Sequence, residues 1–245
     1  MRKLLSVLLL SGAMLSPSFV RANDLANDMS DPLFLQKIEE IFTQTSVTYW
    51  DHILRAGQSV SYGMNNRLTM GANVHYQQDF NGHEDGFAAI DVGGIYRMGT
   101  ADDNDAHIIS DVLFGFKFGG SSDVRTPDYA DSTYYAGLRF GRQWAGLTLA
   151  ATVKSTWVFD DERGIAFLDF TPEAYFRTSP DWRIGTGLTI RKATHKDPKY
   201  GTDYDQEWLH FKVVRQYGRT QYIGHVDFEF ESDDAQVGAR INILF

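Results

Sequence analysis

The sequence contains no cysteine, few prolines and no long apolar run. The absence of cysteine excludes a disulfide framework and any thiolate metal or nucleophile chemistry. Downstream of the N-terminal region there is no stretch of about 18 apolar residues that could form a membrane helix. If the chain enters a membrane, it therefore does so as strands. With 6 prolines, 22 glycines and 14% aromatic residues, the composition favours long strands joined by tight turns.

The N-terminus has the features of a signal peptide. Residues 1–3 give a positive start, and residues 4–15 form an apolar run that is too short to span a bilayer. The tripeptide Val20-Arg21-Ala22 then places tolerated residues at the positions that a signal peptidase reads. We therefore predict a signal peptide over residues 1–22 and export of the remaining chain.

Between residue 43 and the C-terminus, apolar residues recur at every second position. This is the period of a strand with two unlike faces. In residues 222–230, for example, one face is apolar and the other carries charge. Turn signals between such segments predict about twelve strands, most of them longer than the roughly 9 to 11 residues that a tilted strand needs to cross a bilayer. The predicted strands are residues 43–51, 53–64, 67–80, 87–99, 106–119, 132–143, 146–159, 164–178, 182–195, 206–217, 220–231 and 236–245.

These strands predict an all-β fold, an antiparallel transmembrane up-and-down β-barrel of about twelve strands over residues 43–245. An even strand number places both termini on the periplasmic side, where such barrels have their short turns. Counting back from the C-terminus assigns the short turns 65–66, 143–145, 179–181 and 218–219 to that side, and the mostly longer, acidic connections 79–86, 119–132, 196–205 and 231–234 to the other. Two connections depart from this pattern: the long turn at 100–105, and the short first hairpin at Asp51-His52.

The polar face of the strands is expected to line the lumen. A barrel of about twelve strands is too wide for inward side chains to fill as a soluble core, whereas a polar interior suits a membrane barrel. The predicted inward face carries charges of both signs, which can pair across neighbouring strands. The candidate lumen-lining residues are Arg55, Asp91, Arg97, Asp111, Lys117, Arg139, Lys154, Asp169, Glu173, Arg191, Lys212, Asp227, Glu229 and Arg240.

Tryptophans near strand ends predict two interfacial girdles, with Trp144 and Trp182 on the inner side and Trp50, Trp157 and Trp208 on the outer side.

Residues 23–42 are predicted to form an N-terminal periplasmic segment. Within it, residues 31–40 have an N-cap aspartate, a proline at the first helical position and spaced acidic and basic residues, which predict one short helix. This helix either plugs the lumen or lies at the mouth of the barrel.

The last residues of the chain carry a resemblance to a known group of proteins. Val237, Ala239, Ile241, Ile243 and Phe245 alternate up to a terminal phenylalanine. This pattern resembles the C-terminal signal of Gram-negative outer-membrane β-barrel proteins, although Ile243 stands where an aromatic residue is common. The resemblance identifies no subfamily. It implies insertion into the bacterial outer membrane by the barrel assembly machinery, with the lipid bilayer and lipopolysaccharide as the surroundings.

No catalytic, cofactor or metal site is predicted. Some outer-membrane barrels are rim proteases, which need paired carboxylates and an Asp–His couple, but acids and histidines scattered over outer loops are typical of a solvated surface. Such residues here are Asp51, His52, His83, Glu84, Asp85, His195, Asp203 and Asp205. The chain has no G-x-S-x-G motif, and residues 79–86 lack the ligand spacing of an EF-hand. The lumen histidines His75, His107, His210 and His225 are expected to join the polar network rather than to bind metal. A net charge of -9 argues against nucleic acid as a partner.

The distribution of charge leads to the functional prediction. The predicted outer loops are strongly acidic, which predicts binding of divalent cations that also bridge lipopolysaccharide phosphates. In the predicted lumen, bases outnumber acids, which predicts a preference for anions if a pore is open. The sequence thus favours a passive channel for ions or small solutes. The alternatives are a structural or surface barrel with a lumen closed by its own salt bridges, a rim enzyme, and, as a different fold, a soluble periplasmic calyx.

Overall fold

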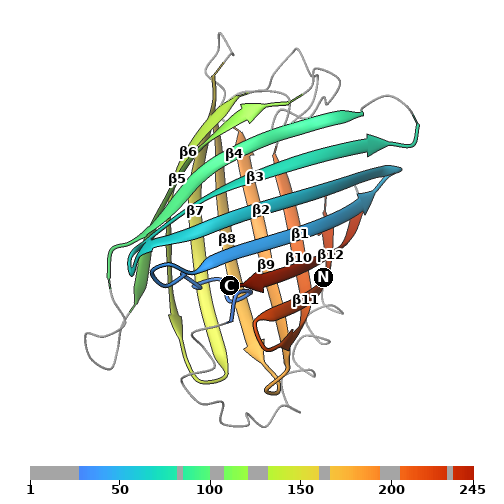
Figure 1. The fold of residues 1–245 in the computed structure, drawn as a ribbon. Helices are drawn as coiled ribbons and strands as arrows, with labels where there is room; N and C mark the ends of the chain where they lie inside the picture. The colour runs from blue at the N-terminus through green and yellow to red at the C-terminus, as the bar shows by residue number, and fades with distance from the viewer. Residues whose placement is uncertain are drawn as a thin grey trace.

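The computed structural model describes residues 28–81, 85–99, 108–120, 132–159, 166–193, 205–230 and 234–245. In this part of the chain, twelve antiparallel strands form a closed barrel, in which each strand pairs with its neighbours in the sequence and the last pairs with the first (Figure 1). The strands are β1 (Ile41–Trp50), β2 (Ile53–Asn65), β3 (Leu68–Asp79), β4 (Gly86–Arg97), β5 (Ile109–Gly119), β6 (Thr133–Gln143), β7 (Leu147–Val158), β8 (Ala166–Arg177), β9 (Trp182–Ala193), β10 (Gln206–Tyr217), β11 (Thr220–Glu229) and β12 (Ala235–Leu244). The predicted all-β, up-and-down barrel is confirmed.

The barrel has a terminal end, where β1 begins and β12 finishes, and an opposite, distal end. At the terminal end, the amide of Phe245 donates to the carbonyl of Ile41 at 2.8 Å, which joins the two ends of the sheet. The predicted short turns between β2 and β3, β6 and β7, β8 and β9, and β10 and β11 all lie there. At the distal end, Asp51 and His52 have φ values of 34° and 66° and close a two-residue hairpin between β1 and β2. Positive φ at both central residues matches the right-handed twist of the flanking strands.

Several predictions fall on residues outside the described part. These are the signal peptide, the turn at 100–105, His107, and most of the acidic outer loops, including His83, Glu84, His195 and Asp203.

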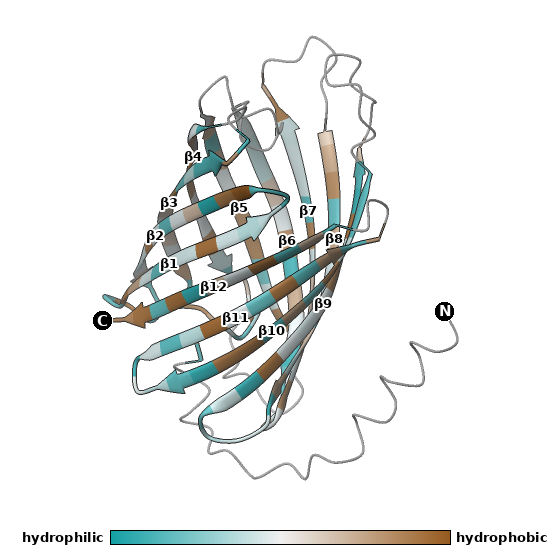
Figure 2. Ribbon diagram, turned by 90° about the vertical axis from the view of Figure 1, so that its right-hand side faces the viewer, coloured by the Kyte–Doolittle hydropathy of each residue, from teal (hydrophilic) through white to brown (hydrophobic). Residues whose placement is uncertain are grey.

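Large apolar residues are exposed on the outward face of the sheet. Apolar and polar residues alternate along the strands that face the viewer in Figure 2, such as β11 and β12. Leu138 on β6, Phe170 on β8 and Ile241 on β12 are 51%, 41% and 42% exposed. Within the described residues, buried apolar side chains form only three small clusters rather than one continuous core. In the same residues there is no helix of the length and apolarity needed to span a membrane.

The positions of the tryptophans correct part of the girdle prediction. Trp144 and Trp182 are exposed at the terminal end, and Trp157 stacks on Tyr134 with ring centroids 4.9 Å apart. Trp50 instead lines the lumen, with the Arg55 guanidinium 4.5 Å from its ring centroid. Trp50 has the same parity on β1 as the inward residues before it, so strand alternation turns it away from the outer surface.

Trp208 departs from the girdle prediction for the same reason, because it shares the inward parity of His210 and Lys212 on β10.

Candidate functional site: the barrel lumen

Residues 28–40, which we call the plug, lie inside the terminal end of the barrel. These residues contact strands on all sides of the barrel, which places them inside the lumen rather than beside the barrel. The wall residues that hydrogen-bond the plug are Ser61 on β2, Arg97 on β4, Arg139 on β6, Thr148 on β7, Tyr175 and Arg177 on β8, Arg183 on β9, Lys212 on β10 and Gln221 on β11.

The predicted short helix over residues 31–40 is wrong, because these residues form turns and extended chain. Donors on the wall take the carbonyls that a helix would pair internally. The carbonyl of Leu33 accepts from Arg97 Nη2 at 2.6 Å, and the carbonyl of Phe34 accepts from Arg139 Nη2 at 3.4 Å. Glu39 has a φ of 67°, which also ends any helical path.

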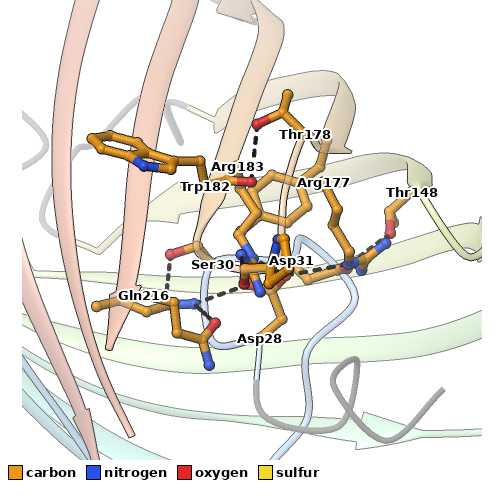
Figure 3. Close-up of polar contacts among 12 residues, drawn as sticks. Asp28, Ser30, Asp31, Thr148, Arg177, Thr178, Trp182, Arg183 and Gln216 are labelled. Carbon is orange, nitrogen blue, oxygen red and sulfur yellow. Dashed lines mark hydrogen bonds and ion pairs between the residues drawn. The ribbon is translucent and has the colours of Figure 1, made fainter. Parts of the chain in front are cut away.

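Two aspartates anchor the plug to the wall (Figure 3). Asp28 is fully buried, and its carboxylate accepts from Tyr175 Oη at 2.7 Å, Gln221 Nε2 at 2.9 Å and Arg183 Nε at 3.2 Å. Arg177 Nε lies 3.3 Å from the same carboxylate.

Asp31 occupies the other side of Arg177. Its carboxylate pairs with Arg177 Nη2 and accepts from Thr148 Oγ1 at 2.5 Å, while its second oxygen accepts from the amide of Leu33 at 2.8 Å. Two buried carboxylates thus meet two buried arginines, which balances the charge in a site that excludes water. We call the wall residues of this site the arginine cradle: Thr148, Tyr175, Arg177, Arg183 and Gln221.

A second ionic cluster supports the other side of the plug. Asp111 on β5 is fully buried and accepts from Arg97 Nε at 2.8 Å and from Arg139 Nη2 at 2.5 Å. Both arginines also donate to the plug, to the carbonyls of Leu33 and Phe34. Asp111 therefore holds two wall guanidiniums in position to receive the plug backbone.

The plug also packs closely on Gly63 of β2. A methyl group at this position would lie 1.8 Å from the carbonyl oxygen of Lys37, and its other near neighbours also belong to the plug. Gly63 exchanges backbone hydrogen bonds with Glu39 and Glu40 at 2.9 and 3.0 Å. Only glycine allows this close approach of two backbones.

Between the plug and the distal end the lumen is hollow and polar. A cavity of about 360 Å³ borders Met29 and Ser30 of the plug and is lined by β8 to β12 and by β1, with Lys212 and Arg240 among its residues. A second cavity, of about 290 Å³, shares four lining residues with the first and extends to Trp50 near the distal end. The shared residues are Gln44, His225, Asp227 and Arg240. The two cavities therefore follow one wall of the lumen from the plug outward.

A third cavity, of about 300 Å³, lies against the opposite wall. It is bordered by Phe34 and Gln36 of the plug and by Asn73, Asp91 and Tyr135.

The structure places the predicted lumen-lining residues on the inward face of the sheet, at the strand positions that share parity with the cavity-lining and plug-binding residues. These are Arg55, Asp91, Arg97, Asp111, Lys117, Arg139, Lys154, Asp169, Glu173, Arg191, Lys212, Asp227, Glu229 and Arg240. The residues of the predicted assembly signal, Val237, Ala239, Ile241 and Ile243, lie on the outward face of β12, with Phe245 directly after it. Their recognition by an assembly machinery stays a prediction.

The structure brings some of the predicted lumen residues together in clusters. Asp169 pairs with Arg191 at 2.7 Å and with Lys154 at 3.3 Å. Glu173 lies 3.8 Å from Lys212. His210 lies between Asp227 and Thr189, with its ring nitrogens 2.8 Å from each.

Sequence reasoning missed the arginine cradle and the carboxylate of Asp28 that it holds. A signal was available, because Arg177 and Arg183 have the inward parity at the ends of β8 and β9 on either side of a short turn. Two inward arginines at the terminal end need counter-charges, and Asp28 and Asp31 belong to the segment that enters the barrel at that end.

Comparison with solved structures shows what this architecture is similar to. The KdgM porin aligns with a TM-score of 0.61 at 13% identity, covering 82% of this chain and 98% of its own. The NanC porin aligns with a TM-score of 0.62 at 11% identity, covering 84% and 98%. The chain has the fold of outer-membrane porins.

An outer-membrane channel from Pseudomonas putida F1 aligns with a TM-score of 0.58 at 11% identity, covering 89% of this chain and 99% of its own. No protein-family model matches the sequence, and no curated protein matches it. At these identities the likeness defines the fold, and the chemistry has to be argued from the lumen of this chain.

Proposed function

We propose that the protein is a passive channel of the bacterial outer membrane for ions and small solutes, with a preference for anions. The observation that carries this proposal is the hollow, polar lumen between the plug and the distal end, with cavities that share Gln44, His225, Asp227 and Arg240. A structural barrel has no need of such a space.

The charges on the inward face of the barrel support the anion preference. The two cavities are lined by Arg55, Lys212 and Arg240 against Glu173 and Asp227, which leaves one net positive charge.

Two ionic clusters elsewhere on the inward face have the same sign. Asp111 is paired with two arginines, and Asp169 is paired with Arg191 and Lys154, so each group of three side chains carries one net positive charge. Fixed positive charges in a narrow passage raise the local concentration of anions and lower that of cations. The solved relatives of this fold include porins, one of them with disordered oligogalacturonate, an acidic saccharide. Small acidic solutes are therefore the class that we propose for this lumen.

Single-channel recording in planar bilayers tests the proposal. We expect discrete current steps and, in a KCl gradient, a reversal potential that favours chloride. The variant Lys154→Glu places two carboxylates beside Arg191 and is expected to shift the reversal potential toward cations. Lys192→Glu changes the charge by the same amount on the outward face of β9, where Lys192 pairs with Asp205, and is expected to leave it unchanged. A cation-selective wild type, or an equal shift in both variants, would contradict the anion preference.

The apolar outward face supports placement in a lipid bilayer. Phe170 lies near the middle of β8 and points outward, whereas the next residue, Thr171, lines the cavity beside the plug. We expect Phe170→Arg to lower the free energy of unfolding in phospholipid vesicles by about 2–4 kcal/mol, because the charge would enter hydrocarbon. Thr171→Arg is expected to cost much less, because its side chain stays in the polar lumen. Urea unfolding of the two variants measures the difference, and equal costs would argue against a membrane position.

We also propose lipopolysaccharide as the surrounding lipid of the outer leaflet, and recognition of Val237 to Phe245 by the barrel assembly machinery. The alternation of outward side chains up to the end of β12 supports the second proposal.

The plug favours a second candidate function, a structural barrel with a closed lumen. Its buried contacts with the arginine cradle and with Asp111's two arginines hold it inside the terminal end in the described structure. A channel therefore conducts either past the docked plug or after the plug has left this position.

A further inference from the structure

The charged side chains of the plug that are buried lie in one ionic site. Ser30 and Asp31 are almost fully buried and Asp28 is completely so, whereas Lys37, Ile38 and Glu39 are exposed. Of the plug's apolar side chains, Leu33 is the one that joins a buried cluster, with Ile109 and Ala150. The carboxylates of Asp28 and Asp31 therefore make the charged contacts of the plug with the wall, beside the hydrogen bonds that its backbone accepts from Arg97, Arg139 and Lys212.

The arginine cradle is built by the wall and does not depend on the plug for its shape. Arg183 Nη1 donates to the carbonyl of Ser179 at 3.2 Å and to that of Pro180 at 2.5 Å, both in the short turn between β8 and β9. Arg177 Nη1 donates to the carbonyl of Trp144 at 3.3 Å. The remaining donors stand on β7, β8 and β11. If the plug withdrew, this set of donors would remain as a preorganised site.

The chemistry of the cradle defines the ligand that it would take. The guanidinium of Arg177 contacts the carboxylates of both Asp28 and Asp31. Arg183, Tyr175 and Gln221 donate to the carboxylate of Asp28. Thr148 donates to the carboxylate of Asp31. Planar guanidiniums with flanking hydroxyl and amide donors are the groups that bind carboxylates best. A short molecule with two carboxylates reproduces what Asp28 and Asp31 offer.

We propose that the arginine cradle is a dicarboxylate-binding site, that Asp28 and Asp31 occupy it as a tethered ligand, and that dicarboxylate solutes displace the plug and open the terminal end. This inference rests on the proposed channel function, and it names the solute class and the regulation of that channel. A tethered ligand acts at an effective concentration of about millimolar or above, so the free solute has to be supplied at higher concentration than for an empty site.

The absence of cysteine allows a test that does not depend on ion flow. Met29 is 7% exposed and borders two of the cavities. In the sequence it stands between the two anchoring aspartates, Asp28 and Asp31. In the variant Met29→Cys, the rate of labelling by a small membrane-impermeant thiol reagent reports withdrawal of the plug. We expect slow labelling of the refolded barrel, and labelling several-fold faster in succinate than in acetate at equal ionic strength.

Further changes in the Met29→Cys background distinguish loss of the plug's charges from steric displacement of the plug. Asp28→Asn with Asp31→Asn removes the charge but keeps the side-chain size, and we expect fast labelling without succinate and no further response to it. Gly63→Ala pushes the plug away sterically and leaves the cradle charges intact, so it is also expected to label fast. Gly224→Ala is the matched control, because a methyl group there would meet no atom within 4 Å. Heat modifiability on gels confirms that each variant is folded.

The outcomes distinguish this inference from the channel function. Slow labelling of the double asparagine variant, or no difference between succinate and acetate in Met29→Cys with Asp28 and Asp31 intact, overturns the inference. Conductance recorded on the same variants tests the channel separately. If labelling is fast but the barrels never conduct, the dicarboxylate site stands and the channel function is rejected. If the barrels conduct steadily while the thiol of Met29→Cys is labelled slowly under all conditions, the channel function stands and the dicarboxylate site is rejected.

Discussion

The variant Asp111→Ala is expected to lower the free energy of unfolding of the barrel by about 3–5 kcal/mol, the usual cost of removing one partner from a buried ionic group. The Asp111 side chain has no exposed surface, and Arg97 and Arg139 reach it from the two neighbouring strands. Without the carboxylate, two guanidiniums would face each other with little water to screen them. Neither can move away, because both are fixed to the wall by their strands.

Equilibrium unfolding in urea, followed by tryptophan fluorescence in detergent micelles or vesicles, measures this cost. Glu173→Ala provides the comparison, because Glu173 is 29% exposed and lies 3.8 Å from Lys212. We expect a loss of about 1 kcal/mol or less for such a partly hydrated pair. Equal losses for the two variants would show that Asp111 does not hold the arginines in the folded barrel.

The variant Arg177→Met is expected to have a different kind of effect, although the Arg177 side chain is as deeply buried as that of Asp111. Its partners, Asp28 and Asp31, belong to the plug, so they can return to water by undocking while the barrel remains folded. The loss of barrel stability is therefore expected to be smaller than for Asp111→Ala. If docking weakens by about 3 kcal/mol, the undocked population rises about 100-fold.

Limited proteolysis measures this population. Lys37 offers trypsin a cleavage site inside the plug, where its amide now donates to Glu40 Oε2 at 2.9 Å. We expect much faster cleavage there in Arg177→Met than in the wild type, with the urea midpoint of the barrel little changed. Arg215→Met is the control, because Arg215 lies over Trp182 on the outward face, away from the plug. A large fall in barrel stability without faster cleavage would mean that the plug is an inseparable part of the fold.

The strands could be predicted from the sequence because a two-sided sheet imposes a strict period of two. Residues 222–230 show this, since Tyr222, Phe228 and Phe230 lie outward and the charged members lie inward, with Ile223 as the apolar exception on the inward face. The closing turns were also readable, because short polar pairs such as Gly218-Arg219 separate apolar segments. The face on which a tryptophan near a strand end lies was harder to predict, because a shift of one position in the sequence moves a side chain to the opposite face. Trp50, which lines the lumen, is an example.

The plug could not be predicted in the same way. Its local sequence favours a helix, with an N-cap aspartate followed by Pro32, but the donors that replace the helical hydrogen bonds lie on distant strands. Asp31 and Arg177 are separated by 146 positions in the chain, and Asp28 and Arg183 by 155. No local sequence pattern predicts a pairing between residues so far apart in the chain. The inward parity of Arg177 and Arg183 indicated only that both need a partner of opposite charge.

The seam between β1 and β12 has a consequence for how the barrel is made. It joins Phe42 to Leu244, so closing it costs more chain entropy than any hairpin in the sheet. The plug immediately precedes β1, and its anchors lie on β8 and β9. Once these contacts form, the start of β1 is tethered about two-thirds of the way along the sheet, and the loop that remains to be closed extends only from β9 to β12. We therefore expect a docked N-terminal segment to lower the entropic cost of closing the seam.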